Sequence, residues 1–486
     1  MAEHCAPDPF ERRRAQLAAW ITGGAFERIA ELDQTRVFAG ENRTKLLVWR
    51  LLWHYRGLYA PCQGVVARLS GLDQEGRRPM YYVARGSIPP QRHTQHRAPD
   101  GSLYAEELFG MEGFTGRSSL LYHVTPPTQT NRIEPVCRIE LEAADDGLHR
   151  HRLTKTGPVR PNGDVISGRV PLYFNNDVVF GVVRPAEPMP PDTFYRNGIA
   201  DEMLFVHEGS GVCDTIFGTL RYGPGDYIVL PIGTTWRLEP DAGSEQRMLY
   251  LEAPSVIEPP KRYRNDYGQL LEHAPYSQRD LHAPNVAEPR ADEGEFVIHV
   301  RSADRITAYH YRRHPYDVVG WDGYLWPFRF NIGDFQPITG RVHQPPPVHQ
   351  TFQARNFVVC SFVPRKFDYH PLAIPAPYNH SNINSDEVIY YVAGNFMSRR
   401  GVDIASFTLH PAGIPHGPHP GTAEASIGKE RTEELAVMVD TFHPLRTTRQ
   451  AAELDDPAYP SSWLPPEDAA GEARELGERG PEAFPD

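Results

Sequence analysis

The feature that most constrains the fold of this 486-residue chain is a repeated frame of a glutamate, a glycine and a tight turn. In the second half, Glu387 is followed seven positions later by Gly394, and a Pro-x-Gly-x-x-His segment spans residues 411–416. In the first half, Glu202 is followed seven positions later by Gly209, and a Pro-x-Gly-x-x-Trp segment ends at Trp236. Because proline fixes φ and glycine accepts positive φ, both segments predict turns between strands. A frame that occurs twice predicts two similar β units.

The chain between these motifs also favours strands. It contains 47 prolines and 40 glycines, and short runs of alternating apolar and polar residues lie between turn residues. We predict a mainly β protein with strands that include residues 177–183, 202–207, 227–231 and 248–251, and a last strand over residues 434–442.

Both ends of the chain differ from this body. Residues 1–79 carry helical apolar spacing and predict a helical N-terminal extension, either native or an over-extended start of a gene that begins at Met80. The predicted first domain covers residues 80–290 and the second covers 291–446. Residues 447–486 form an acidic, proline-rich tail, of which roughly the last 20 residues are expected to be disordered.

Composition excludes several classes of protein. A net charge of −12 argues against a nucleic-acid surface, which needs a basic stripe. The five cysteines are widely spaced and include no C-x-x-C pair, as is typical of a reducing compartment. No secretion signal is visible, and the apolar stretch at residues 46–60 is too short and too charged to span a bilayer. We therefore expect a cytoplasmic protein that binds neither nucleic acid nor membrane.

A concentration of histidines beside a carboxylate indicates a metal site in the second half. Seven of the 21 histidines fall between His343 and His419. His380, Glu387 and His416 would supply two imidazoles and one carboxylate, which is the ligand set of non-haem Fe(II) with open positions for substrate and O₂. The pattern therefore favours an oxygenase.

Neighbouring residues compete for two of these ligand positions. Asp386 precedes Glu387, but alternation along a strand sends the two side chains to opposite faces, and the repeat selects the glutamate. His419 competes with His416, which the repeat selects because it stands where Trp236 stands in the first half. The first half has no matching histidines and is expected to be structural.

The frame resembles that of the cupin superfamily, in which two motifs hold a metal inside a small antiparallel barrel. This resemblance implies a bicupin, with two cupin-like antiparallel β-barrels of which the second holds the metal. More specific motifs resemble the homogentisate 1,2-dioxygenase family, its bacterial branch in particular, over nearly all of residues 80–463; they are residues 92–95, 101–108, 317–321, 378–380, 408–410 and 416–418.

The resemblance implies an activity and a set of site residues. The activity is the Fe(II)-dependent conversion of homogentisate and O₂ to maleylacetoacetate in tyrosine and phenylalanine catabolism, by a homo-oligomer that is a trimer or a hexamer. His380, Glu387 and His416 match the family's iron ligands, and His416 would also face the substrate. His410 matches a second active-site histidine that would hydrogen-bond substrate or oxygen, and Tyr378 is expected to contact the substrate.

Departures from the family concern the base and the substrate. Asp322 stands where better-known members carry the histidine proposed as base, so Asp322, His343 and His349 are the candidates for that catalytic role. Asp322 would need its pKa raised by burial. Phe396 replaces a substrate-contacting tyrosine, and the spacing between the first histidine ligand and the glutamate is one residue longer. A related hydroquinone or a gentisate-like aromatic acid therefore stays open as the substrate.

Two other classes of function fit the fold. A Zn- or Mn-dependent bicupin isomerase would bind a sugar phosphate and should gather Lys and Arg at its pocket mouth. The second half offers tyrosines and phenylalanines instead, which suit an aromatic ring. A non-catalytic binding module is the other class, and the intact set of ligands argues against it.

Overall fold

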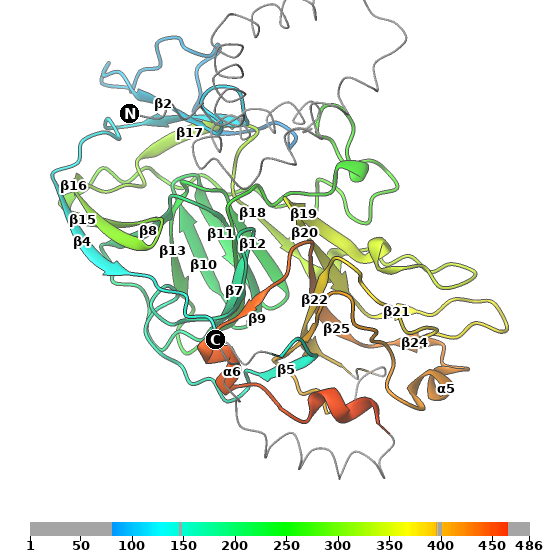
Figure 1. Ribbon diagram of the computed structural model, residues 1–486. Coiled ribbons are helices and arrows are strands. Elements are labelled where there is room, and N and C mark those ends of the chain that lie inside the picture. Colours follow the sequence, from blue (N-terminus) through cyan, green and yellow to red (C-terminus); the bar gives the residue numbers. More distant parts are fainter. Residues whose placement is uncertain (1–79, 145–147, 395, 397–400, 465–486) are drawn as a thin grey trace, which may run out of the picture. The chain divides into compact units, whose positions relative to one another are not determined.

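The computed structural model describes residues 80–144, 148–394, 396 and 401–464 (Figure 1). The expectations for residues 1–79 and for the end of the tail lie outside the described residues. All described residues belong to one compact unit and are mainly β, as predicted. Each strand expected from alternation is present; the one expected last, at 434–442, is β25 (Leu435–Thr441), and the two-residue strand β26 (Arg446–Thr447) follows it.

Three large sheets are stacked in the described part of the chain. The outer sheet has the order β11 (Gly218–Tyr222), β10 (Gly211–Thr215), β13 (Thr235–Pro240), β8 (Thr193–Asn197), β15 (Glu293–Ser302), β16 (Arg305–Arg313) and β4 (Arg132–Arg138). The central sheet has the order β18 (Phe328–Asn331), β12 (Asp226–Leu230), β9 (Asp201–Glu208), β14 (Arg247–Ala253), β7 (Val179–Val183), β6 (Arg169–Phe174) and β26. The third sheet has the order β19 (Gln350–Ala354), β20 (Phe357–Phe362), β25, β22 (Asp386–Ala393), β23 (Ser406–His410) and β5 (Arg152–Lys155).

Smaller elements complete the fold. A four-stranded sheet has the order β1 (Val83–Gly86), β17 (Val318–Gly323), β3 (Ser118–His123) and β2 (Ala105–Gly110), and β21 (Arg365–Lys366) pairs with β24 (Arg431–Thr432). The short helices are η3 (Lys261–Tyr263), η4 (Ile332–Asp334), η5 (Pro346–His349), α5 (Thr422–Ser426), α6 (Arg449–Glu453) and η6 (Tyr459–Trp463). None of the described helices is long and apolar enough to cross a bilayer.

Strand alternation produces the layers between the sheets. In β9, Leu204 and Val206 face the outer sheet, whereas Met203 and Phe205 face the third sheet, because successive side chains point to opposite faces. The central sheet is therefore buried on both faces. In β22, Val388, Tyr390 and Val392 join the same shared core, and Ile389 and Tyr391 point to the far face of the third sheet, where a separate apolar cluster forms.

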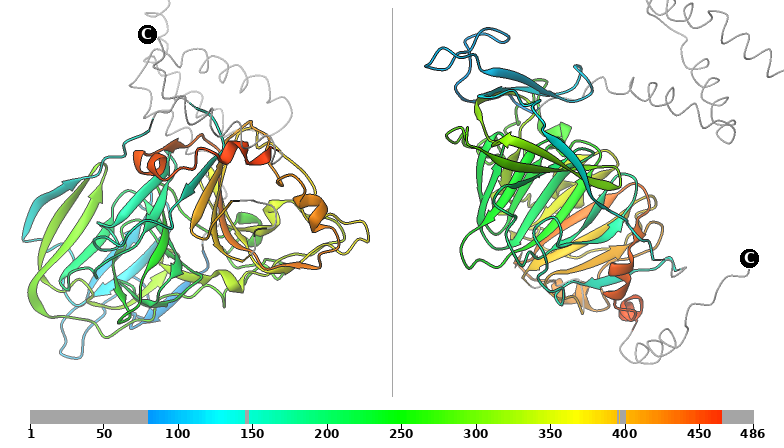
Figure 2. Two further views of the ribbon diagram at one scale, coloured as in Figure 1. Left: turned by 90° about the horizontal axis from the view of Figure 1, so that it is seen from below. Right: turned by 90° about the vertical axis from the view of Figure 1, so that its left-hand side faces the viewer.

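The two halves close differently. The outer and central sheets, here the first half, enclose an apolar core between them. The third sheet, the second half, is covered on its far face by the β21–β24 pair, by irregular segments and by a single bridge between His380 and His416. In Figure 2 the C-terminal helices α6 and η6, in red, lie at one end of the strands of this sheet. The fold is cupin-like in both halves, although no sheet closes on itself.

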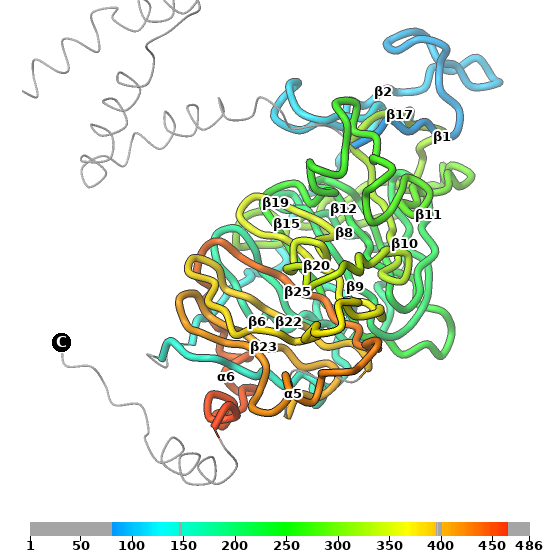
Figure 3. Tube along the Cα trace, turned by 90° about the vertical axis from the view of Figure 1, so that its right-hand side faces the viewer, coloured from blue at the N-terminus to red at the C-terminus, as the bar shows by residue number. Residues whose placement is uncertain are grey.

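Strand pairing crosses the predicted domain boundary at residue 290. Strand β15 pairs in parallel with β8 of the outer sheet, and β18 pairs with β12 of the central sheet. In the other direction, β5 extends the third sheet beside β23 (Figure 3). These exchanges come from segments that the repeat does not cover, and the division into domains stays a prediction.

The repeat holds in three dimensions. Glu202 and Glu387 are the second residues of β9 and β22, and Gly209 and Gly394, which follow these strands, adopt φ of 98° and 93°. The predicted turns are present too, since the glycines of both P-x-G segments have positive φ.

Candidate metal centre

Two histidines and one glutamate converge on the far face of the third sheet. Side-chain donor atoms of His380, Glu387 and His416 all lie within 4.8 Å of one another. The backbone brings the histidines together, because His380 N–H donates to His416 O and His416 N–H donates to His380 O, each at 2.8 Å. Glu387 and His416 are buried, whereas the side chain of His380 is 31% exposed, so the cluster is open on the side of His380.

Glu387 is held ionised by its neighbours. Its Oε2 lies 3.5 Å from His380 Nε2, and its Oε1 lies 2.8 Å from His410 Nδ1. Burial by itself would raise the pKa of Glu387, but the interactions with His380, His410 and His416 outweigh it and hold this pKa well below its usual range. An ionised carboxylate is the form that binds a metal ion.

The first half carries the same geometry with different chemistry. Tyr195 pairs with Trp236 in the outer sheet where His380 pairs with His416, and Trp236 Nε1 donates to Glu202 Oε2 at 3.0 Å. The cation here is Arg169, which donates to Glu202 and Glu252 at 2.7 and 2.6 Å. A guanidinium of the chain itself therefore neutralises the glutamate in the first half.

In the described residues of the second half, the corresponding acids are Glu387 and Asp440, and no arginine pairs with them as Arg169 does in the first half. Asp440 lies opposite Glu387 in the pairing of β25 with β22, as Glu252 lies opposite Glu202. Burial, and then the charge of Glu387, raise the pKa of Asp440 well above its usual range. Among the described residues, His416 Nε2 is buried and lies 3.4 Å from Glu387 Oε1, without the geometry of a hydrogen bond. A divalent cation fits this set, because it would bind the lone pair of His416 Nε2. It would also supply the positive charge that Arg169 supplies in the first half.

The competing ligands take other partners. Asp386 points away from Glu387 and accepts hydrogen bonds from the backbone N–H groups of Ala412 and Leu445, both at 2.7 Å. Asp201 does the same in the first half, with Ile232 and Ile257, so this aspartate is part of the repeat and ties down the turn. The ring of His419 stacks on Trp463, with centroids 4.3 Å apart, and its Nε2 contacts Ser462 Oγ at 2.7 Å.

The structure gives His410 a different place from the expected one. We predicted that it hydrogen-bonds substrate or oxygen. Instead it is fully buried, its Nδ1 contacts Glu387 and its Nε2 contacts the hydroxyl of Tyr459 at 3.2 Å. Since protein groups occupy both ring nitrogens, His410 supports the glutamate from behind.

Of the three candidates for the base, His343 contacts a ring beside the open side. Its ring packs edge-on against Tyr378 at 5.3 Å, and Tyr378 packs against His380 at 5.8 Å. Tyr378 is 43% exposed, so the rings of His343, Tyr378 and His380 line the approach to the cluster. Burial lowers the pKa of His343 below its usual value, which keeps the imidazole neutral and able to accept a proton.

The other two candidates belong to different surroundings. Asp322 lies on β17 of the four-stranded sheet, where it accepts hydrogen bonds from Tyr82 at 2.6 Å and from Arg92 at 3.0 Å. His349 is buried against Phe362, and burial lowers its pKa to about 3, so it is a poor base at neutral pH. Asp322 and His349 as bases therefore find no support in the geometry.

Phe396 is placed by its contact with a neighbouring ring. It packs on Tyr391 at 4.6 Å, inside the apolar cluster on the far face of the third sheet. Tyr391 lies four residues along β22 from Glu387, or about 13 Å at the strand rise of about 3.3 Å per residue. The predicted substrate contact of Phe396 would require a ligand that extends this far.

Residues beyond the predicted second domain contribute to the site. Tyr459 contacts His410, and Trp463 stacks on His419 and donates to Gly417 O at 3.1 Å. The ring of His151, the residue before β5, packs against the ring of His416 with centroids 6.0 Å apart. The described part of the predicted tail, up to residue 464, thus contributes to the site.

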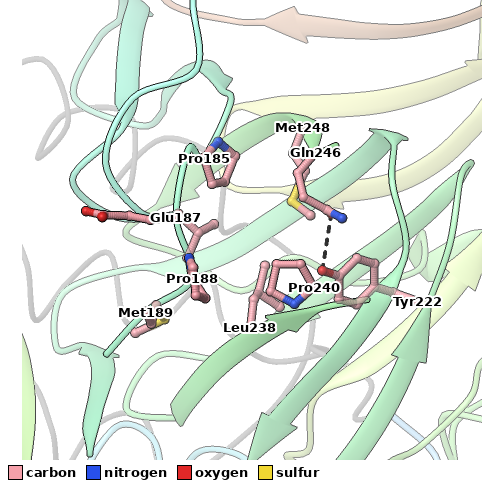
Figure 4. Close-up of a pocket in the computed structure, with 10 residues that line it drawn as sticks. Pro185, Glu187, Pro188, Met189, Tyr222, Leu238, Pro240, Gln246 and Met248 are labelled. Carbon is pink, nitrogen blue, oxygen red and sulfur yellow. Dashed lines mark hydrogen bonds between the residues drawn. The ribbon is translucent and has the colours of Figure 1, made fainter. Parts of the chain in front are cut away.

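In the described part of the first half, Glu202, Tyr195 and Trp236 are all buried, so the glutamate there has no opening comparable to that beside His380. A hollow at its edge, lined by Tyr222, Leu238, Gln246 and Met248 among others, has a volume of only about 10 Å³, enough for about one water molecule (Figure 4). Within it Tyr222 donates to Gln246 at 3.2 Å. The described chemistry is therefore concentrated in the second half.

The fold and the cluster define a two-part, cupin-like β protein that has, among its described residues, one candidate metal-binding cluster of two histidines and one carboxylate. Among known proteins, the Saccharolobus solfataricus protein named "Putative dioxygenase SSO1533" is 41% identical over 388 residues, which cover 79% of this chain and 99% of that protein. The chain belongs to the family of this dioxygenase.

More distant similarities are weaker. The homogentisate 1,2-dioxygenase of Rhodopseudomonas palustris is 25% identical over 423 residues, 78% of this chain and 90% of that protein. A solved cupin 2 conserved barrel domain protein from Leptotrichia buccalis covers 63% of this chain and 100% of its own at a TM-score of 0.27 and 9% identity, which is too low to bear on function. No model of a known protein family matches the chain.

Proposed function

We propose that this protein is an Fe(II)-dependent ring-cleaving dioxygenase whose substrate is homogentisate, converted with O₂ to maleylacetoacetate. The observation that carries the proposal is the cluster of His380, Glu387 and His416, open on one side and flanked there by an aromatic ring. When bound, Fe(II) would supply open positions at which the substrate and O₂ meet. The relationship to a dioxygenase at 41% identity supports the reaction class, and the 25% match supports the substrate.

The chain's own residues divide the remaining work. His380, Glu387 and His416 would hold the ion, and Tyr378 would pack against the substrate ring at the open side. His343, next to Tyr378, is our candidate for the group that removes a phenolic proton, because it is the predicted base that lies on this side. A base in this position contributes about 10²–10⁴-fold to such a step.

A related hydroquinone or a gentisate-like acid is the second candidate substrate. Asp322, which accepts a hydrogen bond from Arg92, and Phe396, which packs on Tyr391, are the two residues that depart from the homogentisate family, and these departures support the alternative substrate. Asp322 in place of a histidine, or Phe396 in place of a tyrosine, would alter how the substituents of the ring are recognised and would leave the metal ligands unchanged.

The test is O₂ consumption by the full chain after reconstitution with Fe(II), with homogentisate, gentisate and hydroquinone as separate substrates. Uptake with homogentisate, together with the ultraviolet absorbance of maleylacetoacetate, is the expected result. Uptake with another ring only would replace the substrate, and no uptake with any ring despite one bound iron per chain would refute the reaction. His416→Ala should lose iron and turnover, whereas His314→Gln, at a buried histidine of another aromatic cluster, should keep both.

A further inference from the structure

The C-terminal segment places a buried hydroxyl behind the metal centre. Tyr459, in η6, is 2% exposed, and its hydroxyl lies 3.2 Å from His410 Nε2. His410 is fully buried, and its ring stacks on His416 with centroids 4.5 Å apart. A continuous series of contacts therefore runs from the tail segment through His410 to Glu387.

Hydrogen-bond chemistry gives this series a direction. A carboxylate that is to bind a metal is ionised and can only accept, so His410 Nδ1 must carry the proton and donate to Glu387 Oε1. With Nδ1–H fixed, Nε2 of a neutral imidazole is an acceptor, and Tyr459 O–H donates to it. Tyr459 thus fixes the tautomer of His410.

The first half offers a natural comparison. The strand residue that pairs with Glu202 is Leu230, whereas the one that pairs with Glu387 is His410. Leu230 is part of the apolar core of the first half. The histidine therefore accompanies the metal-type glutamate and is absent where Arg169 takes the place of the cation.

We propose that Tyr459 is a positioning residue of the candidate metal centre, which acts through His410 to fix the orientation of the Glu387 carboxylate that would bind the ion. This inference rests on the proposed function, since it requires that the cluster bind a metal. It assigns a role in the site to a segment that follows both halves of the repeat. Groups that hydrogen-bond a ligating residue change metal affinity by about 10- to 100-fold when removed.

The test is a double-mutant cycle with Co(II) as the probe, read by its dissociation constant and its visible absorption spectrum. Tyr459→Phe keeps the ring and removes the hydroxyl; we expect about 10- to 100-fold weaker binding and an altered spectrum. In the His410→Leu background, the same change should have no further effect. Tyr227→Phe is the matched control, because that buried hydroxyl contacts Ser361 Oγ at 2.9 Å in the shared core, and it should leave both readouts unchanged.

Several outcomes would overturn the inference. One is wild-type affinity and spectrum in Tyr459→Phe; another is an equal loss in the presence and absence of His410, which would indicate packing alone. If Tyr459→Phe does not fold, His410→Asn serves instead, because it keeps a donor for Glu387 and loses the contact with Tyr459; wild-type behaviour there also refutes the role. A wild-type chain that binds neither Co(II) nor Fe(II) would refute the proposed function itself.

Discussion

Replacing Arg169 by methionine should destabilise the protein strongly, although Arg169 lies outside the metal centre. Its NH1 lies 2.7 Å from Glu202 and 2.6 Å from Glu252, and the three side chains are 8%, 1% and 3% exposed. Removal of one partner from a buried ion pair costs about 3–5 kcal/mol, because a charge is left without compensation. Arg301 also pairs with Glu252, so the loss should lie near the lower end, at about 3 kcal/mol.

The effect should depend on pH in a defined direction. Burial raises the pKa of Glu252 above its ordinary value already in the wild type. A carboxyl whose folded-state pKa is raised opposes folding at high pH, and this opposition is relieved as pH falls through the raised pKa. Without Arg169 that pKa rises further, so the variant should be most destabilised at pH 7 and less so at pH 5.

Urea unfolding at both pH values, followed by circular dichroism, measures this effect. Arg221→Met is the control, since Arg221 is 67% exposed beside Asp241 and should change the free energy of unfolding by no more than about 0.5 kcal/mol. A loss of less than about 1 kcal/mol for Arg169→Met, or a loss that is equal at both pH values, would refute the view that Arg169 takes the place of a cation.

Three further predictions concern the second half. Glu387→Gln should lower the stability of the metal-free protein at pH 7, because the folded-state pKa of Glu387 is depressed. The stability that the ionised glutamate contributes is complete above its ordinary pKa of 4.5 and is lost as pH falls through the lower folded-state value. Thermal unfolding in the presence of a chelator at pH 7 and pH 3 would measure this difference. His343→Gln should lower kcat by about 10²-fold or more, and Asp322→Asn by less than about tenfold, in steady-state O₂ uptake; equal effects would contradict the assignment of the base. Light scattering should give a trimer or a hexamer, and a monomer would contradict the expected assembly.

The sequence predicted the parts of the fold that depend on local pattern. Alternation located β9, and the repeat with Glu202 assigned Glu387 the same strand position, so that Asp386 had to point to the opposite face. The repeat also selected His416 over His419, and the structure gives these two histidines different surroundings. The ligand roles themselves stay predictions that metal binding must test.

Long-range pairing and the partners of buried polar groups could not be predicted from pattern. Nothing in residues 152–155 indicates that β5 extends the third sheet, and nothing near Asp322 indicates that Arg92 would neutralise it. Such partners are decided by which segments the topology brings together. The place of Tyr459 behind His410 is of the same kind, since 49 residues separate them.

The two halves satisfy one electrostatic requirement in two ways. Each buries a glutamate at the same strand position with a second acid opposite it, and burial of such a pair is stable only if positive charge accompanies it. In the first half Arg169 is a permanent cation, so the site is complete when the chain folds. In the second half three histidines contact the glutamate, and no arginine among the described residues pairs with it. On the proposed function, the second half is the one that would take a cation from solution, and the lack of an arginine beside Glu387 among the described residues supports that proposal together with the histidines.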